Sequence, residues 1–182
     1  MVKSRAVIIT AISVSIWAQS AQAAVPSAYQ LIAQTTGVPP VVLYAVALQE
    51  SGKTIHPKLH RPWPWTLNVA GKSYYYANQH KACTALHIAL KAHNPKNIDV
   101  GIAQINWGWN PGIFASPCEA LNPYKNLTAA GHLLRKHYRA SGDWNVATGL
   151  YHHPAGGHIA ARYQKSVAQR LNTLRYITTT QK

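Results

Sequence analysis

The segment VVLYAVALQESG, Val41 to Gly52, limits the fold more than any other part of the chain. Its first eight residues are apolar without interruption, and they follow two prolines, which suit the first turn of a helix. A helix that is apolar on nearly every side is buried in the middle of a core. We therefore expect a buried helix at Val41–Gln49, surrounded by other elements. Gly52 is predicted to end this helix in the left-handed conformation.

Other segments predict a helical protein with a small β element. Apolar residues recur at helical spacing in five further places: Pro26–Thr36, Gln79–His93, the Leu127, Ala130, Leu134 and Tyr138 face, a short helix capped by Asp143 and running through Leu150, and the Ile159, Tyr163, Val167, Leu171 and Leu174 face. Trp65–Val69 and Ser73–Tyr76 predict a hairpin. His56–Pro64 is predicted to be irregular and Asn94–Pro123 to be a structured loop. The expected fold class is mainly α (α+β), in a single domain.

The N-terminus has the layout of a secretory signal peptide. Lys3 and Arg5 precede an uncharged apolar run, and Ala21-Gln22-Ala23 is a small-residue cleavage pattern. We predict a signal peptide at residues 1–23 and a mature domain at residues 24–182, with a retained membrane anchor as the alternative. No later segment is long and apolar enough to cross a membrane, so no stable membrane insertion is expected after removal.

The charge predicts an anionic partner. Eighteen basic residues stand against four acidic ones, a net charge of +14, and loss of Lys3 and Arg5 would lower it to +12. Such a surface attracts polyanions. Nucleic acid, anionic lipid and a carboxylate-bearing cell-wall polymer all satisfy this condition, and the charge does not choose among them.

The two cysteines, Cys83 and Cys118, predict one disulfide in an exported protein. Closing a loop of about 35 residues would stabilise the fold by roughly 3–4 kcal/mol. Two free thiols are the alternative. The ten histidines follow no known metal-ligand spacing, so neither a metal nor a cofactor is expected.

Glu50 stands two residues after the end of the apolar run, and two interpretations of it remain open. Burial and the negative end of the helix dipole would raise its pKa and make it a general acid. Alternatively, it pairs with Lys53 or Lys58. A two-carboxylate glycosidase needs a second acid, and Asp99, Glu119 and Asp143 are the candidates. Asp143 is better explained as a helix cap, Glu119 follows a cysteine, and Asp99 has a turn-forming role as its alternative. The scarcity of acids favours a mechanism with a single carboxylate.

Several short motifs, in order, resemble those of a known family. They are Glu50-Ser51 with Pro57 a few residues on, Gly101-Ile102-Ala103-Gln104-Ile105, Asn122-Pro123-Tyr124-Lys125-Asn126-Leu127 and Leu150-Tyr151-His152. Over Pro26–Leu174 the chain resembles the SLT-type lytic transglycosylases, which have a goose-lysozyme-like (lysozyme-like) fold. It looks closest to small exported members linked to conjugative elements and secretion systems. Ala103 replaces the family's methionine, and His152-His153-Pro154 replaces its Asn-Ala-Gly.

The resemblance implies a role for each matched residue. Glu50 would be the catalytic acid and base, supported by Ser51 and Tyr151. Tyr151 would orient the acid. Gln104 would bind sugar, as would Gly101, Ile102 and His152. Of the loop and hairpin tryptophans Trp63, Trp65, Trp107 and Trp109, one or two are expected at the sugar groove, and Trp107 is the one assigned to substrate.

The resemblance also implies the setting. It predicts a periplasmic monomer that cleaves peptidoglycan glycan strands without a cofactor, that serves a conjugation or secretion complex, and that has no nucleic acid partner. Two rival functions remain. One is a lysozyme-type hydrolase in which Asp99 positions water, and the other is a non-catalytic basic protein that binds peptidoglycan or nucleic acid.

Overall fold

The computed structural model describes residues 25–57 and 59–180, so the predicted signal peptide lies outside the described residues. The described residues form a mixed α+β fold with six α-helices and two small antiparallel sheets. The helices are α1 Ser27–Thr36, α2 Pro40–Ser51, α3 Gln79–Ala92, α4 Pro123–Ser141, α5 Trp144–His152 and α6 Gly157–Thr180. The strands are β1 Gly52–His56, β2 Leu59–Pro62, β3 Thr66–Val69, β4 Lys72–Tyr75, β5 Ile98–Val100 and β6 Ile105–Asn106.

Helix α2 is the buried helix that the sequence predicts. Its residues from Val42 to Leu48 are all buried, and Pro40 occupies its first turn. The prediction for Gly52 is wrong, since this residue has φ −56° and ψ 125° and begins β1. A Cβ atom at Gly52 would lie 2.4 Å from both the Leu48 carbonyl oxygen and His60 Nε2. Glycine is therefore required here for close packing and not for a left-handed turn.

The prediction that His56–Pro64 is irregular is also wrong in part. Strands β1 and β2 form an antiparallel hairpin in which Gly52 pairs with Pro62 and Thr54 with His60. The Thr54 hydroxyl and His60 Nδ1 lie 3.1 Å apart across the hairpin. Pro62 stands at the end of β2, a position where the ladder does not need its missing N–H.

The second sheet has the order β4-β3-β5-β6 and packs against α3. The predicted β3–β4 hairpin is confirmed, with positive φ at Ala70 and Gly71 in its turn. Strands β5 and β6 lie within the segment predicted as a structured loop. A second apolar core lies between this sheet, α3 and the short 3₁₀ helix η3 (Glu119–Leu121). It consists of Leu67, Ala82, Leu86, Ala89, Ile98, Val100, Ala120 and Leu121.

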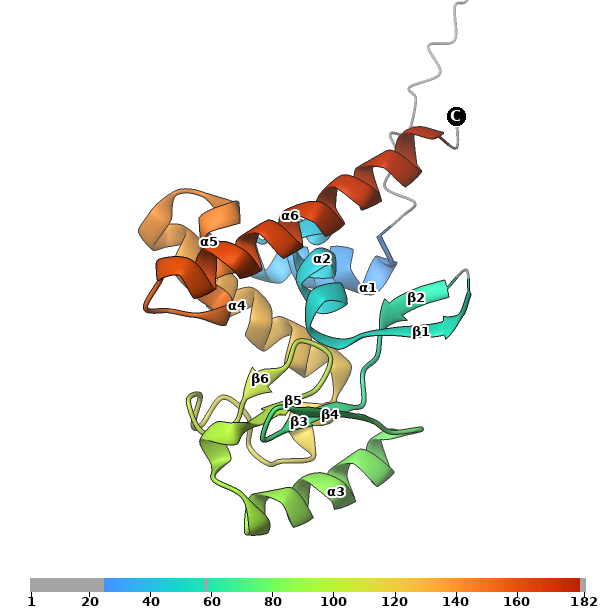
Figure 1. Cartoon of the computed structure of the whole chain (residues 1–182), viewed down its shortest axis with the longest axis vertical. Helices are drawn as coiled ribbons and strands as arrows, with labels where there is room; N and C mark the ends of the chain where they lie inside the picture. Colours follow the sequence, from blue (N-terminus) through green and yellow to red (C-terminus); the bar gives the residue numbers. More distant parts are fainter. Residues whose placement is uncertain (1–24, 58, 181–182) are drawn as a thin grey trace, which may run out of the picture.

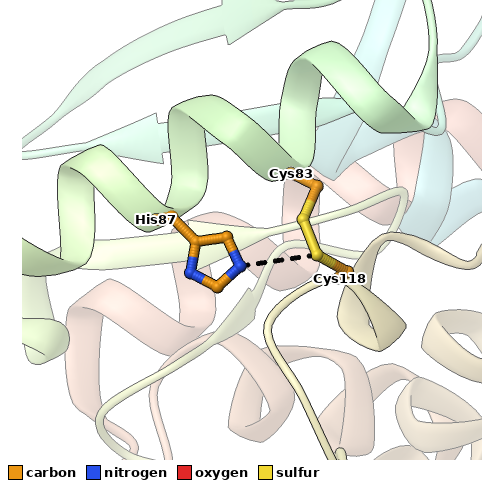
Figure 2. A group of neighbouring side chains, drawn as sticks. All are labelled: Cys83, His87 and Cys118. Atoms are coloured by element: carbon orange, nitrogen blue, oxygen red, sulfur yellow. Dashed lines mark hydrogen bonds between the residues drawn. A yellow bond between two sulfur atoms is a disulfide. The ribbon is translucent and has the colours of Figure 1, made fainter.

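The predicted disulfide is confirmed. Cys83 on α3 is bonded to Cys118, which immediately precedes η3 (Figure 2). The bond links two elements that border the second core and are separated by 35 residues in the sequence.

The main core lies among α1, α2, α4 and α6. Helix α2 is in its centre, and its C-terminal end points towards the strands (Figure 1). The predicted inward faces are confirmed at Leu127, Ala130 and Leu134 of α4 and at Val167 and Leu171 of α6. The end of α2, where Glu50 stands, is thus held between the helical part of the molecule and the second sheet (Figure 1).

Among the described residues, no single helix is long and apolar enough to cross a membrane. Helices α1 and α2 pass that test of length and composition only as a pair, bent by 115°.

Candidate active site

A cavity of about 270 Å³ opens beside the end of α2. Residues from α2, β5, β6, α4 and α5 and from the loops around β6 line it. We call it the Glu50 cavity, and its lining residues are Glu50, Asp99, Gln104, Ile105, Asn106, Trp109, Asn110, Leu133, Tyr151 and His152. The structure therefore brings together four predicted site residues: Glu50, Gln104, Tyr151 and His152.

Glu50 is half-buried in the last turn of α2 and accepts a hydrogen bond on Oε1 from the Tyr163 hydroxyl at 2.5 Å. Burial among protein atoms raises the pKa of its carboxyl group from 4.5 to about 8. The Tyr163 hydrogen bond opposes this rise, and the negative charge of Asp99 adds to it. The predicted upward shift is confirmed. Glu50 holds a proton at neutral pH, as a general acid must.

The alternative in which Glu50 pairs with Lys53 is wrong. The Lys53 ammonium group lies 4.4 Å from the Trp63 ring centroid and 5.5 Å from the Tyr75 ring centroid, and forms cation–π contacts with both. Lys58 lies outside the described residues.

Tyr163 is a site residue that the sequence did not single out. Its position on the inward face of α6 predicted a core residue, and its ring is indeed buried. However, its hydroxyl donates to Glu50, and the His152 ring stacks on its ring with centroids 4.5 Å apart and planes 6° from parallel. Helical spacing identifies a buried tyrosine but does not identify the partner of its hydroxyl.

Tyr151 lines the cavity but does not bond to Glu50. Its hydroxyl donates to the Ala103 carbonyl oxygen at 2.6 Å. The resemblance gave Tyr151 the role of orienting the acid, but the hydroxyl that bonds to Glu50 is that of Tyr163. Tyr151 instead fixes the loop that carries Gln104.

Residues 101–104 form a tight loop that begins with Gly101 at φ +84° and ends with Gln104 at φ +48°. A Cβ atom at Gly101 would lie 2.5 Å from Asn126 Nδ2. The Ser51 hydroxyl, fully buried, donates to the Ile102 carbonyl oxygen at 2.6 Å. Ser51, Gly101 and Ile102 do not line the cavity. They connect the loop to α2, and Gly101 and Ile102, which were expected to bind sugar, lie outside the cavity wall.

Asn126 holds the same loop from the side of α4. It is fully buried, its Oδ1 accepts from the Ala103 amide at 2.8 Å, and its Nδ2 donates to the Val100 and Ala120 carbonyl oxygens, each at 2.9 Å. The sequence included Asn126 in a matched motif without assigning it a role. Its three hydrogen bonds join α4, β5 and the Gln104 loop.

Gln104 lies at the cavity wall with its side-chain amide already bonded. Nε2 donates to the Gly101 carbonyl oxygen at 2.8 Å and to the Thr66 carbonyl oxygen at 3.2 Å. The side-chain oxygen is the group of Gln104 that these bonds do not use. Gln104 therefore offers a hydrogen-bond acceptor to a ligand.

The tryptophan assignment needs correction. Trp107 packs against the second core and is absent from the cavity lining, whereas Trp109 lines the cavity and is 66% exposed. Trp65 packs against the second core, and Trp63 donates from Nε1 to the Tyr76 carbonyl oxygen. Of these four tryptophans, Trp109 is the one at the cavity.

Asp99 is the second carboxyl group of the cavity, and the turn-forming alternative for it is wrong. It stands in β5, where its Oδ1 accepts from Asn106 Nδ2 at 2.8 Å. Burial raises its pKa, and the Asn106 hydrogen bond opposes the rise. The other two acids are elsewhere: Glu119 pairs with Lys125, and Asp143 caps α5 through the Asn145 and Val146 amides as predicted.

One group of side chains among the described residues has the spacing of metal ligands. Atoms of Cys83, His87 and Cys118 lie within 4.8 Å of one another, and His87 Nε2 is 3.5 Å from Cys118 Sγ (Figure 2). Both sulfur atoms belong to the disulfide and offer no thiolate. In this oxidised form the group is not a metal site.

Comparison of the chain with family models, with curated proteins and with solved structures found no match.

Proposed function

We propose that this protein is a lytic transglycosylase with a lysozyme-like fold, which cleaves the β-1,4 bond between N-acetylmuramic acid and N-acetylglucosamine in peptidoglycan. The observation that carries the proposal is the state of Glu50. It is a carboxyl group beside a cavity, with a pKa of about 8 and a tyrosine hydroxyl fixed on one oxygen. The motifs from Glu50 to Tyr151 support the choice of substrate through their resemblance to the family.

The reaction needs one group that first gives a proton and then takes one. The protonated Glu50 donates to the glycosidic oxygen as the bond from that oxygen to the muramic C1 breaks, and N-acetylglucosamine leaves with the proton. The muramic C6 hydroxyl oxygen then bonds to C1, and its proton passes to the Glu50 carboxylate. The product carries a 1,6-anhydro end, water is not consumed, and Glu50 is again protonated.

The surroundings of Glu50 suit both halves of this cycle. The Tyr163 bond engages Oε1, which leaves Oε2 to carry the proton. The same bond also favours the carboxylate, since it lowers the pKa of Glu50. It therefore stabilises the charged form that exists between the two proton transfers. The substrate's own acetamido group stabilises the cation at C1, so the enzyme needs no nucleophile.

The test is product analysis on purified sacculi. The protein without its residues 1–23 should release muropeptides whose mass corresponds to 1,6-anhydro ends, and Glu50→Gln should release none. Glu119→Gln supplies a control, because it makes the same substitution in an acid that lies away from the cavity, and it should leave the products unchanged. Equal release by parent and Glu50→Gln would show that Glu50 is not the acid.

The pH dependence gives an independent check. A general acid with a pKa of about 8 is active below that pH and inactive above it. Activity should therefore fall as the pH rises through about 8. A falling limb near pH 4.5 would mean that Glu50 has the ordinary pKa of a glutamate and would contradict the proposal.

A hydrolase is the second candidate, and Asp99 is the observation that favours it. Asp99 lines the same cavity as Glu50 and interacts electrostatically with it, so it is placed among the groups that a water molecule there would meet. A hydrolase would give reducing ends and would lose activity in Asp99→Asn. A transglycosylase would retain its 1,6-anhydro products in that variant.

The setting is part of the same proposal. We infer export to the periplasm, action as a monomer and local opening of the wall for a conjugation or secretion apparatus. The disulfide supports an oxidising compartment. A zymogram separates the enzyme from a basic binding protein, because a protein that only binds peptidoglycan would clear it in neither parent nor Glu50→Gln.

A further inference from the structure

Lys96 and Trp109 form a pair at the edge of the Glu50 cavity. Trp109 lines the cavity with 66% of its surface exposed, and the Lys96 Nζ lies 3.9 Å from its ring centroid. Lys96 is exposed as well. An indole ring held in water beside a cavity offers a ligand the face that Lys96 does not cover, and the ammonium group on the other face adds a positive charge beside it.

The backbone that carries this pair is fixed before any ligand binds. The Gly108 amide donates to the Pro95 carbonyl oxygen at 3.1 Å, and a Cβ atom at Gly108 would lie 2.5 Å from the Lys96 amide nitrogen. Asn106 Nδ2 donates to the Lys96 carbonyl oxygen at 2.9 Å. The turn that carries Trp109 and the turn that carries Lys96 are therefore packed directly against each other.

Asn106 also connects this pair to the acids of the cavity. Its Oδ1 accepts from the Gly108 amide at 3.1 Å and from the Trp109 amide at 2.9 Å, while its Nδ2 donates to Asp99 Oδ1 at 2.8 Å. One side chain thus fixes the position of Trp109 relative to Asp99. A ligand that contacts the ring is held in a defined position relative to the cavity.

Lys96 forms no ion pair with any residue in 25–57 or 59–180, where Lys125 and Glu119 make the salt bridge. Among these same described residues, its ammonium group contacts the face of the indole ring. The Lys96 ammonium group can therefore pair with an anionic ligand without breaking an existing ion pair. A sugar ring that bears a carboxylate matches both members of the pair, because the sugar ring can stack on Trp109 and the carboxylate can form an ion pair with Lys96.

We propose that Lys96 and Trp109 form a subsite for an acidic pyranose, in which Trp109 stacks on the sugar ring and Lys96 pairs with a carboxylate on that sugar. This proposal rests on the proposed function and names the sugar that the subsite selects. In peptidoglycan the carboxylate comes from one of two sources, the lactyl ether of muramic acid after the stem peptide is removed, or the stem peptide itself. Neutral N-acetylglucosamine units lack it.

The experiment measures binding in the Glu50→Gln background, so that no ligand is cleaved. The probes are chitotetraose, a stem-free tetrasaccharide of alternating N-acetylglucosamine and muramic acid, and the same tetrasaccharide with stem peptides, each titrated by calorimetry at low and high salt. Lys96→Met should lower the binding affinity for an acidic probe about three-fold at low salt, as for an exposed ion pair, and should leave the affinity for chitotetraose unchanged. Trp109→Ala should lower the binding affinity for all three probes about ten-fold. Lys91→Met is the matched control, because Lys91 is an exposed lysine on α3 outside the cavity lining.

Each outcome has a defined meaning. If Lys96→Met weakens binding of the stem-free probe, Lys96 pairs with the lactyl carboxylate. If it weakens binding of the stem-bearing probe alone, Lys96 pairs with a carboxylate of the stem peptide. Both results support the subsite. Unchanged binding of both acidic probes by Lys96→Met, or unchanged binding of all probes by Trp109→Ala, overturns it. Binding does not depend on turnover, so this result is separate from the sacculus digestion, and failure of either proposal can be recognised while the other stands.

Discussion

Replacing Glu50 with glutamine should make the protein more stable, and increasingly so as the pH rises. The carboxyl group has a pKa of about 8 in the folded protein against 4.5 for an unperturbed glutamate. Below pH 4.5 both folded and unfolded chains hold this proton, and the group has no effect. Between pH 4.5 and 8 the folded protein holds a proton that the unfolded chain has lost, so the stability of the parent falls as the pH rises.

The size of the effect follows from these two values. Each pH unit above 4.5 lowers the free energy of unfolding of the parent by about 1.36 kcal/mol, which amounts to about 3 kcal/mol at pH 7. Solvent reaches part of the side chain and screens some of this cost, so we expect a difference of about 2–3 kcal/mol between parent and variant. Glutamine is neutral at every pH and keeps a side-chain oxygen that can accept from Tyr163.

Urea unfolding followed by tryptophan fluorescence measures the free energy of unfolding of both proteins at about pH 4, 6, 7 and 8. The two should agree at about pH 4, and Glu50→Gln should become the more stable as the pH rises. Glu119→Gln is a control of opposite sign, because the Lys125 ion pair lowers the pKa of Glu119. That variant should lose stability above pH 4.5, a loss that disappears as the pH falls. Equal stability of parent and Glu50→Gln at every pH would refute the conclusion that burial raises the pKa of Glu50.

Three more perturbations test the site and its support. Tyr163→Phe keeps the ring but removes the hydrogen bond that lowers the Glu50 pKa, so the falling limb of the pH–activity profile should move to higher pH; a limb that stays in place or moves down contradicts this. Asn126→Ala removes hydrogen bonds to three buried backbone groups and should lower the free energy of unfolding, measured with urea, by about 3 kcal/mol or more; a loss below about 1 kcal/mol would show that water replaces the amide. Reduction of the Cys83–Cys118 disulfide should lower the free energy of unfolding by roughly 3–4 kcal/mol, as measured by comparing the reduced and alkylated protein with the intact one. An unchanged unfolding midpoint would mean that the bond does not restrain the unfolded chain.

The sequence was most informative where a single residue or a short hydrophobic pattern determines the local structure. The uninterrupted apolar run predicted the buried helix α2, and the position of Asp143 predicted the cap of α5. The position of Glu50, two residues after this run, gave a raised pKa as one of its two open interpretations. The signals for these properties lie within a few turns of the chain and are visible in the sequence, although the burial that raises the Glu50 pKa is provided by other elements.

The sequence was least informative about which side chains meet. Gly52 was expected to end a helix through its backbone freedom, but close packing by His60 from another strand decides its conformation. Trp107 and Trp109 stand two residues apart in similar surroundings, and only the packing of the second core separates the buried ring from the exposed one.

What the sequence determined by itself is the framework: six helices with their inward faces, one hairpin, one disulfide, and an acid at the end of the most apolar helix. What only the tertiary structure decided is the partner of that acid. The hydroxyl on Glu50 comes from Tyr163, 113 residues away, and not from Tyr151, whose hydroxyl bonds to Ala103. Periodicity fixes which face of a helix is buried, but the end of a long side chain is placed by the packing of whole helices against each other, and no local pattern encodes that.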